Sequence, residues 1–416
     1  MSAQPLPLPV LGVDLLSSET NLTKGCVRAA DNVDITNNGG FRRRGGHAVA
    51  VPGADFHSLH TYGRGTLVGR GTKVYFIDPA SYTPVLLWDM GMQAPVDFTE
   101  YNEHLYFTNR GALAWLPADA MTARTVGAPL PDLLPSIAAY AAGNLLAGTY
   151  AVGLSRLDDR GEESPTALLG TVAIPTDGGG VQLTGLELDP ALTARYRVYL
   201  TPADGDELYV ADEFVAAFTS YIVGTAPDGA QRSTQHLTPM PPGDFVRGHA
   251  GHLYVVVGDT LWFSDAMRPH LRDERHNFIQ FAGTISFIES VSGGLFVGDS
   301  RGVWFLPGND PTQFKLTRAS GRSAVRRSAL RVPGTHFDPE VVQTREDVVL
   351  WLGVDGYMVG RSDGSVVALH PDRVRVAAGL EGKSAVVVRN GLRQVLTLVA
   401  ASTPRTYGFA IDSSIT

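Results

Sequence analysis

The stretch HLYVVVGDTLWFSD, residues 252–265, decides the fold, because it reads as two short apolar strands on either side of a Gly-Asp pair. Runs of four to eight apolar and aromatic residues bounded by turn residues are typical of β-strands. Gly258 and Asp259 tolerate the positive φ angles that a tight hairpin turn requires. The stretch therefore predicts a β-hairpin whose second strand carries an aromatic residue.

The same pattern recurs along the chain. It appears at 66–78, 104–117, 294–308 and 349–360, with Arg301-Gly302 and Asp355-Gly356 as two of the turns. A further strand-like run precedes each copy, at 56–65, 95–103, 244–251, 285–293 and 341–347. The repeat of about 40 residues is the spacing of β-propeller blades.

We therefore predict an all-β fold, a β-propeller of about six blades. The last repeat is expected in SAVVVRNGLRQVLTLV (384–399) followed by TYGFAID (406–412). An array of β-sandwiches with coincidental spacing is the alternative. With 46 Gly and 26 Pro, long amphipathic helices are not expected, and the most helical segments are Leu130–Tyr140 and Pro190–Ala194.

The repeat is interrupted at about residues 145–225, where short alternating strands are separated by Asp-Gly-type turns. This pattern predicts a seven-stranded, immunoglobulin-like sandwich. The strand Tyr150–Leu154, the turn at 161–165 and the Tyr-Arg-Val-Tyr strand at 196–199 resemble fibronectin type III modules. We expect three regions: 1–140 with an N-terminal hairpin and the first blades, 141–228 as the inserted fibronectin-like sandwich, and 229–416 with the remaining blades.

Composition excludes several classes of function. The chain has 416 residues, 44% of them hydrophobic, and a formal net charge of −8 with a pI near 5.8. A protein that wraps a phosphate backbone needs a basic surface, so nucleic-acid contact should be local at most. We expect neither a secretion signal nor a membrane span, and Cys26, the single cysteine, rules out a disulfide framework.

Motifs for chemistry are weak. The pairs His57/His60 and His249/His252 place i and i+3 side chains on opposite faces of a strand, so ordinary structural histidines are favoured over a metal site. Asp204 and Asp206 fit a plain turn better than a calcium loop. We predict no catalytic residue, no metal and no cofactor.

Two alternatives remain open. A glycan- or receptor-binding propeller would use exposed aromatic residues, and a glycan-active enzyme would need carboxylates that converge at the centre of the blades. The candidate aromatic residues are Tyr62, Tyr82, Trp88, Tyr101 and Tyr221.

Two arginine clusters are candidate contact sites. In DNVDITNNGGFRRRGGH (31–47), strands 32–36 and 41–44 should pair across a turn, with Arg42 and Arg44 on one face. The second cluster, in residues 318–334, fits either a helix or a strand and loop. It suits a solvated connector between blades or a contact with an acidic partner. The candidate subunit-interface residues are Arg42, Arg44, Arg318, Arg322, Arg326 and Arg327.

The opening sequence resembles virion proteins of tailed bacteriophages. The phrase Asn32-Val33-Asp34 is followed by Gly40-Phe41 and by Arg44-Gly45, and stretches 241–265, 294–311 and 351–369 are similar in the same way. The best-known similar proteins are the nozzle proteins of short-tailed phages, although those are usually much longer.

The resemblance implies a non-enzymatic structural subunit of a viral tail, as a nozzle, tail-tip or tail-ring component. Copies of the chain would form a homo-oligomeric ring, for example a hexamer, around the channel for genome ejection, and would dock fibres or the tail tube and adaptor. DNA would pass without sequence-specific binding. The protein would be made in the bacterial host cytoplasm and reside in the virion.

Overall fold

The computed structural model describes residues 12–29, 33–35, 41–46, 48–130, 132–337, 339–369, 373, 380–389 and 392–401. Strands dominate this part of the chain. Within it, the helical elements are one short α-helix and three single turns of 3₁₀-helix: α1 (Pro339–Val342), η1 (Glu19–Asn21), η2 (Pro311–Gln313) and η3 (Gly334–His336). None of the described helices is long and apolar enough to cross a membrane.

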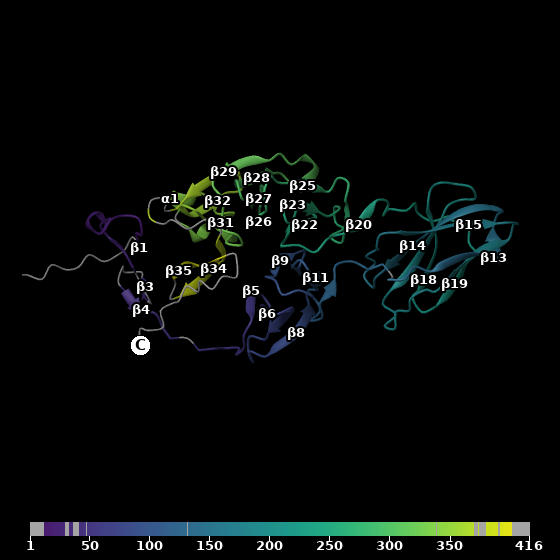
Figure 1. Cartoon of the computed structure of the whole chain (residues 1–416), viewed down its shortest axis with the longest axis horizontal. Helices are drawn as coiled ribbons and strands as arrows, with labels where there is room; N and C mark the ends of the chain where they lie inside the picture. Colours follow the sequence, from purple (N-terminus) through teal and green to yellow (C-terminus); the bar gives the residue numbers. More distant parts are fainter. Residues whose placement is uncertain are drawn as a thin grey trace, which may run out of the picture.

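Five four-stranded antiparallel sheets follow one another along the chain (Figure 1). The first two are β5 (Phe56–Tyr62), β6 (Gly65–Arg70), β7 (Lys73–Ile77) and β8 (Pro84–Asp89), then β9 (Asp97–Tyr101), β10 (His104–Thr108), β11 (Leu113–Leu116) and β12 (Arg124–Thr125). The third and fourth are β21 (Phe245–His249), β22 (His252–Val257), β23 (Thr260–Phe263) and β25 (Phe278–Gln280), then β26 (Phe287–Val291), β27 (Gly294–Asp299), β28 (Gly302–Pro307) and β29 (Thr317–Ser320). The fifth is β30 (Leu330–Pro333), β31 (Asp347–Gly353), β32 (Gly356–Gly360) and β33 (Val366–Ala368).

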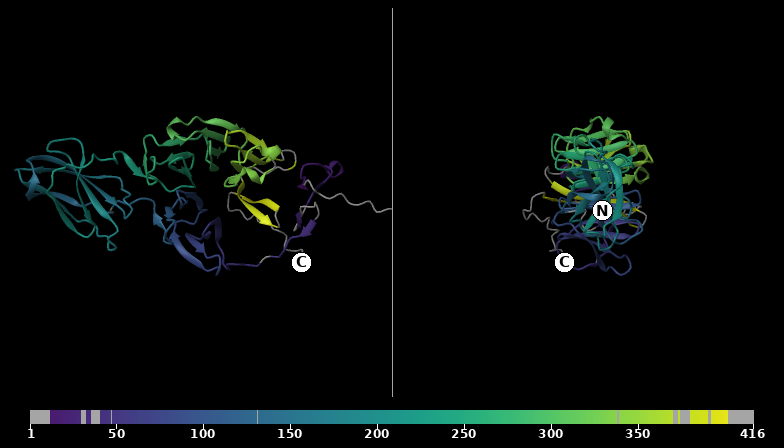
Figure 2. Two further views of the ribbon diagram at one scale, coloured as in Figure 1. Left: turned by 180° about the vertical axis from the view of Figure 1, so that it is seen from behind. Right: turned by 90° about the vertical axis from the view of Figure 1, so that its right-hand side faces the viewer.

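A sixth, two-stranded sheet, β34 (Leu380–Arg389) and β35 (Leu392–Ala401), follows the fifth and covers the expected run 384–399. The run expected after it, 406–412, lies outside the described residues. The sheets stand around a centre formed by their first strands, as blades of a β-propeller (Figures 1 and 2). The predicted all-β propeller fold is thus confirmed, whereas the blade count of about six stays a prediction.

The five predicted hairpins are the middle strands of the five sheets, for example β22 and β23. The turn between these two strands contains Gly258 at a φ of 66°, a left-handed conformation that a side chain would strain. Four of the runs expected before the hairpins are the first strands β5, β9, β21 and β26. The fifth run, 341–347, is not a strand before β31. The first strand of that sheet is β30, and 341–347 holds the end of α1, a bend and the first residue of β31.

The propeller core lies between sheets. Because successive side chains of a strand point to opposite faces, Leu105 of β10 packs toward the first sheet and Tyr106 packs toward the third. Each pair of sheets that are consecutive along the propeller, from the first sheet to β34–β35, shares one apolar cluster. Representative members, in order around the ring, are Phe76 with Phe98, Trp115 with Val255, Tyr254 with Ile288, Phe296 with Trp351, and Leu350 with Val395.

Between the second and third sheets the chain forms a separate two-layer unit that lies to one side of the propeller (Figures 1 and 2). Its sheets enclose one apolar cluster that includes Leu154, Tyr196 and Val198. The three-stranded sheet is β13 (Ser136–Leu145), β16 (Gly179–Thr184) and β19 (Ser220–Val223). The four-stranded sheet is β15 (Ala167–Ile174), β14 (Gly148–Leu157), β17 (Arg195–Leu200) and β18 (Tyr209–Val215). The three region boundaries, 1–140, 141–228 and 229–416, stay predictions.

Both helix predictions are wrong. Leu130–Tyr140 runs into β13, because Ile137 packs on the sandwich cluster and Ser136–Tyr140 pair with β16. Tertiary packing here overrides the helix propensity of the alanines. Pro190–Ala194 is a turn and irregular chain, since the Asp189 carboxylate accepts hydrogen bonds from the N–H of Ala191 and the hydroxyl of Thr193.

Three short strand pairings lie outside the larger sheets. The strand β20 (Leu237–Pro239), where the chain returns from the sandwich, is antiparallel to β24 (Leu271–Asp273). Near the N-terminus, β1 (Gly12–Val13) and β2 (Cys26–Val27) are parallel. The strands β3 (Val33–Ile35) and β4 (Phe41–Arg43) are antiparallel, as predicted for the N-terminal hairpin, and the turn between them lies outside the described residues.

Candidate functional site

Charged side chains converge at the centre of the propeller, where the first strands of the sheets meet. They come from parts of the chain that are far apart in the sequence: β9, the turn between β10 and β11, β21 and the residue before it, β26, the chain before β30, and β34. We call this set the hub cluster. Its carboxylates are Asp97, Asp244, Glu289 and Glu381, and its cations are Arg110, Arg247, Arg326, Arg327 and Lys383.

Arg247 is the centre of the hub cluster. Its Nη1 lies 2.5 Å from Oδ2 of Asp97, and its Nη2 lies 2.5 Å from Oε1 of Glu289. Asp97 also accepts a hydrogen bond from the backbone N–H of Val246. All three charged side chains are buried. One guanidinium thus ties β9, β21 and β26, which belong to three different sheets.

A second group of pairs extends the cluster. Arg110 donates two hydrogen bonds to the Asp244 carboxylate, at 2.8 and 3.1 Å, and Arg326 lies 3.3 Å from the same group. Arg327 donates to Glu381 at 2.8 Å. The guanidinium groups of Arg326 and Arg327 lie 4.9 and 4.7 Å from the centre of the Phe245 ring, a cation–π arrangement.

The electrostatics of the hub cluster favour the charged forms of Asp97 and Asp244. Burial raises the pKa of Asp97, but Arg247 and Lys383 outweigh burial, so this pKa lies below its ordinary value. The pKa of Asp244 is lowered for the same reasons, with Arg110 and Arg326 opposing burial. Burial lowers the pKa of His60, which lies on β5 near the cluster, to about 4, helped by Lys383 and Arg247. His60 is therefore neutral at physiological pH.

This arrangement suits mechanical support better than acid–base chemistry. A glycoside hydrolase needs one carboxyl group that keeps its proton, at a raised pKa, beside a second carboxylate. In the hub cluster Asp97 and Asp244 have lowered pKa values and are engaged by guanidinium groups. The carboxylates thus converge as the enzyme alternative requires, but each is held by a cation.

The structure separates the predicted arginines of residues 318–334, which form the end of β29, a loop and β30 instead of a helix. Arg326 and Arg327 belong to the hub cluster. Arg318, on β29, donates hydrogen bonds to the carbonyls of Arg301 and Gly321. Arg322 pairs with Asp355, and 67% of its side chain is exposed.

Arg42 lies on β4 with its Cα opposite that of Asp34, and Arg44 directly follows the strand. Both side chains are exposed. An interface role for the six arginines stays a prediction, and the exposed ones, Arg42, Arg44, Arg318 and Arg322, are those that a neighbour could reach.

The histidine pairs have structural partners. His57 and His249 each lie within hydrogen-bond distance of a glycine carbonyl, and His252 lies 2.7 Å from the Ser264 carbonyl. No group of metal-ligating side chains occurs among the described residues. Three of the five candidate aromatic residues belong to the first sheet: Tyr62 on β5, Tyr82 in the turn before β8, and Trp88 on β8. Tyr101 lies on β9, and Tyr221 lies in the sandwich, where it stacks on Phe214, so the five are spread over three sheets.

Sequence reasoning missed most of the hub cluster. A signal existed, because a charge stands among apolar or small residues in VDFT (96–99), FVRG (245–248), FIES (287–290) and GKSA (382–385). Charged residues are rarely buried unless they are paired. Four such strands, each at the start of a repeat, could have indicated a shared polar centre.

A second polar group lies where the sandwich joins the propeller. Burial raises the pKa of Glu162 to about 7, and Asp158 adds to the shift. Oε1 of Glu162 lies 3.8 Å from Nδ1 of His270, whose pKa burial lowers. The other ring nitrogen of His270 contacts the Glu163 carbonyl at 3.1 Å. Glu162 thus has a carboxyl pKa near neutrality and lies beside a buried histidine.

Comparison with known proteins gives no identity. No family model and no curated protein match the chain. Among solved structures, similar ones include the N-terminal domain of Nup159, with a TM-score of 0.30, 11% identity and coverage of 83% of this chain and 73% of that one. The nidogen/laminin complex has a TM-score of 0.23 and 12% identity, with coverage of 74% of this chain and 94% of that one. PorZ of Porphyromonas gingivalis has a TM-score of 0.20 and 12% identity, with coverage of 88% of this chain and 55% of that one. Likeness at these TM-scores carries no argument, so the β-propeller assignment is made on sheet order and packing.

Proposed function

We propose that this protein is a non-enzymatic structural subunit of a bacteriophage tail, a nozzle-like or tail-ring component. Copies would assemble into a ring around the DNA exit channel and would dock other tail proteins. The virion would then be its place of action. The proposal joins the resemblance of the sequence to the properties of one exposed surface, an edge of the sandwich.

The observation that carries the proposal is the edge of the sandwich formed by β13 and β15. Neither Ser136–Leu145 nor Ala167–Ile174 contains a charged residue, and both strands pair on one side only. Tyr140, Leu146 and Leu168 are exposed at or beside this edge, with Leu146 at 61%. Free edge strands normally carry charges or prolines that prevent pairing with other chains.

The opposite edge of the four-stranded sheet shows the usual protection. Its last strand, β18, carries Asp212 and Glu213, and Glu213 pairs with Arg197. The β18 edge is thus protected, and the short β19 edge carries no charge. The edge formed by β13 and β15 offers the longest uncharged strands to a neighbouring protein. Because the sandwich lies beside the propeller, a neighbour could reach its far edge without disturbing the blades (Figure 1).

The charge of the chain supports a channel role. A net charge of −8 repels phosphate, so DNA would pass a ring of such subunits without being held. Identical subunits that use two different surfaces for one contact close into a ring when the rotation permits. A strongly basic lumen in the assembled ring would contradict this part of the proposal.

Assembly is the direct test. Electron microscopy and native mass spectrometry of the purified chain should show closed rings with a central opening. Ala139→Lys, which places a charge on the β13 edge, should reduce ring formation at least tenfold, whereas Val215→Lys on β18 should leave it unchanged. Monomers at all concentrations, or equal effects of the two variants, would refute the proposed contact.

The exposed arginines provide a second test. Replacing Arg42 and Arg44 with alanine should weaken assembly more than folding, because exposed guanidinium groups add little to the stability of a monomer. Loss of thermal stability with ring formation unchanged would contradict an interface role for this pair.

A further inference from the structure

One face of the propeller lacks the packing that the others have. Five apolar clusters fill the spaces between neighbouring sheets, from the first sheet round to β34–β35. The remaining space, between β34–β35 and the first sheet, has no such cluster among the described residues. Two apolar faces are left over, one on each of these sheets.

The face on β34–β35 follows from strand alternation. Val386 and Val395 pack against the fifth sheet, so Ala385, Leu396 and Leu398 point the other way. Leu396 and Leu398 are exposed, Leu398 at 69%. Every other sheet of the propeller has four strands, whereas this one has two, and the outer edge of β35 has no strand beside it in the described residues.

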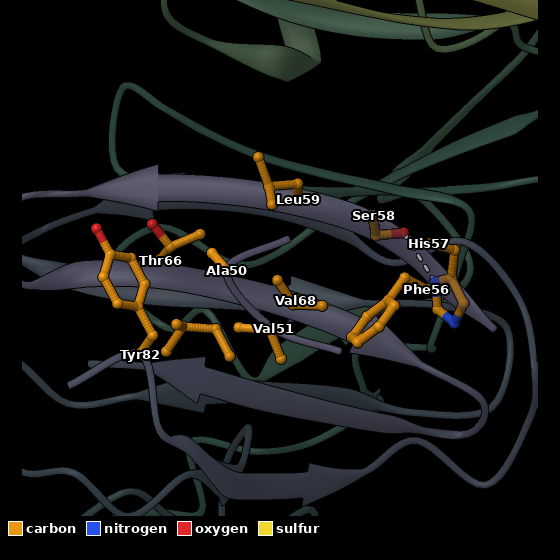
Figure 3. Close-up of a pocket in the computed structure, with 10 residues that line it drawn as sticks. Ala50, Val51, Phe56, His57, Ser58, Leu59, Thr66, Val68 and Tyr82 are labelled. Carbon is orange, nitrogen blue, oxygen red and sulfur yellow. Dashed lines mark hydrogen bonds between the residues drawn. The ribbon is translucent and has the colours of Figure 1, made fainter. Parts of the chain in front are cut away.

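The face on the first sheet carries a pocket of about 490 Å³ (Figure 3). Leu67 and Phe76 pack toward the second sheet, so Thr66, Val68 and Ile77 line the opposite face. The lining of the pocket is predominantly apolar, and Leu59 of β5, at its rim, is 60% exposed. The pocket is open to solvent and several of its apolar lining residues are exposed, which is a feature of surfaces that contact another segment or protein.

We propose that residues 402–416 of this chain occupy this face, beside β35 and against the pocket of the first sheet. The segment starts where β35 ends, at Ala401, so it begins next to the two-stranded sheet. Its fifteen residues can extend up to about 50 Å. Tyr407, Phe409 and Ile411 alternate with small residues, so an extended chain would present all three to one face.

The N-terminal segment is less suited to cover this apolar face. Residues 1–11 contain Pro5, Pro7 and Pro9, which have no N–H to donate to a neighbouring strand. The segment 402–416 has one proline, Pro404, before the alternating stretch. The inference concerns a different face from the sandwich edge and does not depend on ring formation.

The first test changes the charge of the segment in the full chain. Phe409→Asp should lower the melting temperature by a few degrees and increase the fluorescence of a dye that binds exposed apolar surface. The reason is that a carboxylate would displace the segment from the apolar face that it covers. Ser413→Asp adds the same charge at a polar position and should change neither quantity. Wild-type behaviour of Phe409→Asp would overturn the proposal.

The second test places the segment directly. In a Cys26→Ser background, Leu59→Cys and Phe409→Cys should be joined by a short bifunctional maleimide within one chain, at a yield at least tenfold above that of Leu59→Cys with Ser413→Cys. Links between two chains would mean that a second copy fills the pocket, and equal yields would mean that the segment lies elsewhere. Either result would overturn the proposal.

Discussion

The centre of the propeller and the centre of the sandwich are built from opposite chemistry. In the sandwich, two sheets face each other and enclose an apolar cluster that includes Leu154 and Val198. The ion pair of Arg197 with Glu163 lies on the opposite face of β17 from Val198. In the propeller, the apolar clusters lie between the sheets, and the strand edges meet at the axis. That axis holds Asp97, Arg247 and Glu289.

The difference shows which interactions determine how the strands are arranged in each unit. Apolar burial is non-directional, so it holds two layers together without fixing which strands meet. A buried guanidinium that must satisfy two carboxylates from two other sheets has few acceptable partners. We infer that the hub cluster fixes the arrangement of the sheets, and the apolar clusters supply most of the burial.

The largest effect should come from breaking the hub cluster. Arg247→Met would leave Asp97 and Glu289 buried without their cation, which typically costs about 3–5 kcal/mol. Chemical denaturation should show this loss in the free energy of unfolding. Arg275→Met is the matched control, since Arg275 pairs with Asp273 at the surface, and its cost should stay below about 1 kcal/mol. Equal costs would contradict a supporting role for the hub.

A cavity in the sandwich should have a nearly equal but separate effect. Leu154→Ala removes a fully buried side chain, so we expect a loss of about 2–5 kcal/mol. Calorimetry should show that Leu154→Ala and Arg247→Met each lower the midpoint temperature of a different unfolding transition. This result would also test the predicted region boundaries. Leu146→Ala, at an exposed position, should change stability by less than about 0.5 kcal/mol.

The junction between the two units should respond to pH through Glu162. Its folded pKa of about 7 is above the ordinary value, so the folded state holds this proton more tightly. The associated stability is complete below the ordinary pKa and is lost as the pH rises through about 7. His270 works in the opposite sense, because its lowered pKa makes the folded state less stable when the pH falls below the ordinary histidine pKa.

The variant Glu162→Gln isolates the carboxyl group. Between pH 4.5 and 7 the wild type should lose stability relative to this variant, by at most about 3 kcal/mol. Urea denaturation across this range measures the difference, and Glu103→Gln, at an exposed site, should show none. A difference that grows toward low pH would contradict the raised pKa.

The smallest effect should come from the surface pair of Arg322 and Asp355. Because most of the Arg322 side chain is exposed, Arg322→Ala should change the free energy of unfolding by about 0–1 kcal/mol. Thermal melts in low and high salt should differ little. A large loss would show that residues 318–334 brace the propeller as a whole, and not only through Arg326 and Arg327.

The sequence predicted the parts of the fold that depend on local patterns. Alternation and turn glycines such as Gly258 identified the five hairpins, because those signals lie within one stretch of chain. Leu130–Tyr140 was mistaken for a helix, since only contacts with the distant β16 favour a strand there.

The candidate site was mostly out of reach of sequence reasoning. Arg326 and Arg327 were noticed as basic residues, but their carboxylate partners Asp244 and Glu381 lie far away in the sequence. Arg247 is one arginine among apolar neighbours, and nothing local pairs it with Asp97. Long-range pairing depends on how the sheets close into a ring, which no local pattern reports.

The coupling free energy between Asp97 and Arg247 tests the supporting role of the hub cluster most directly. A double-mutant cycle with Asp97→Asn, Arg247→Met and the double variant measures it from three free energies of unfolding relative to the wild type. We predict a coupling of about 2–3 kcal/mol, because each side chain is buried and each depends on the other. A coupling below about 0.5 kcal/mol would show that the two charges act independently, and would contradict the view that ion pairs at the centre hold the sheets in place.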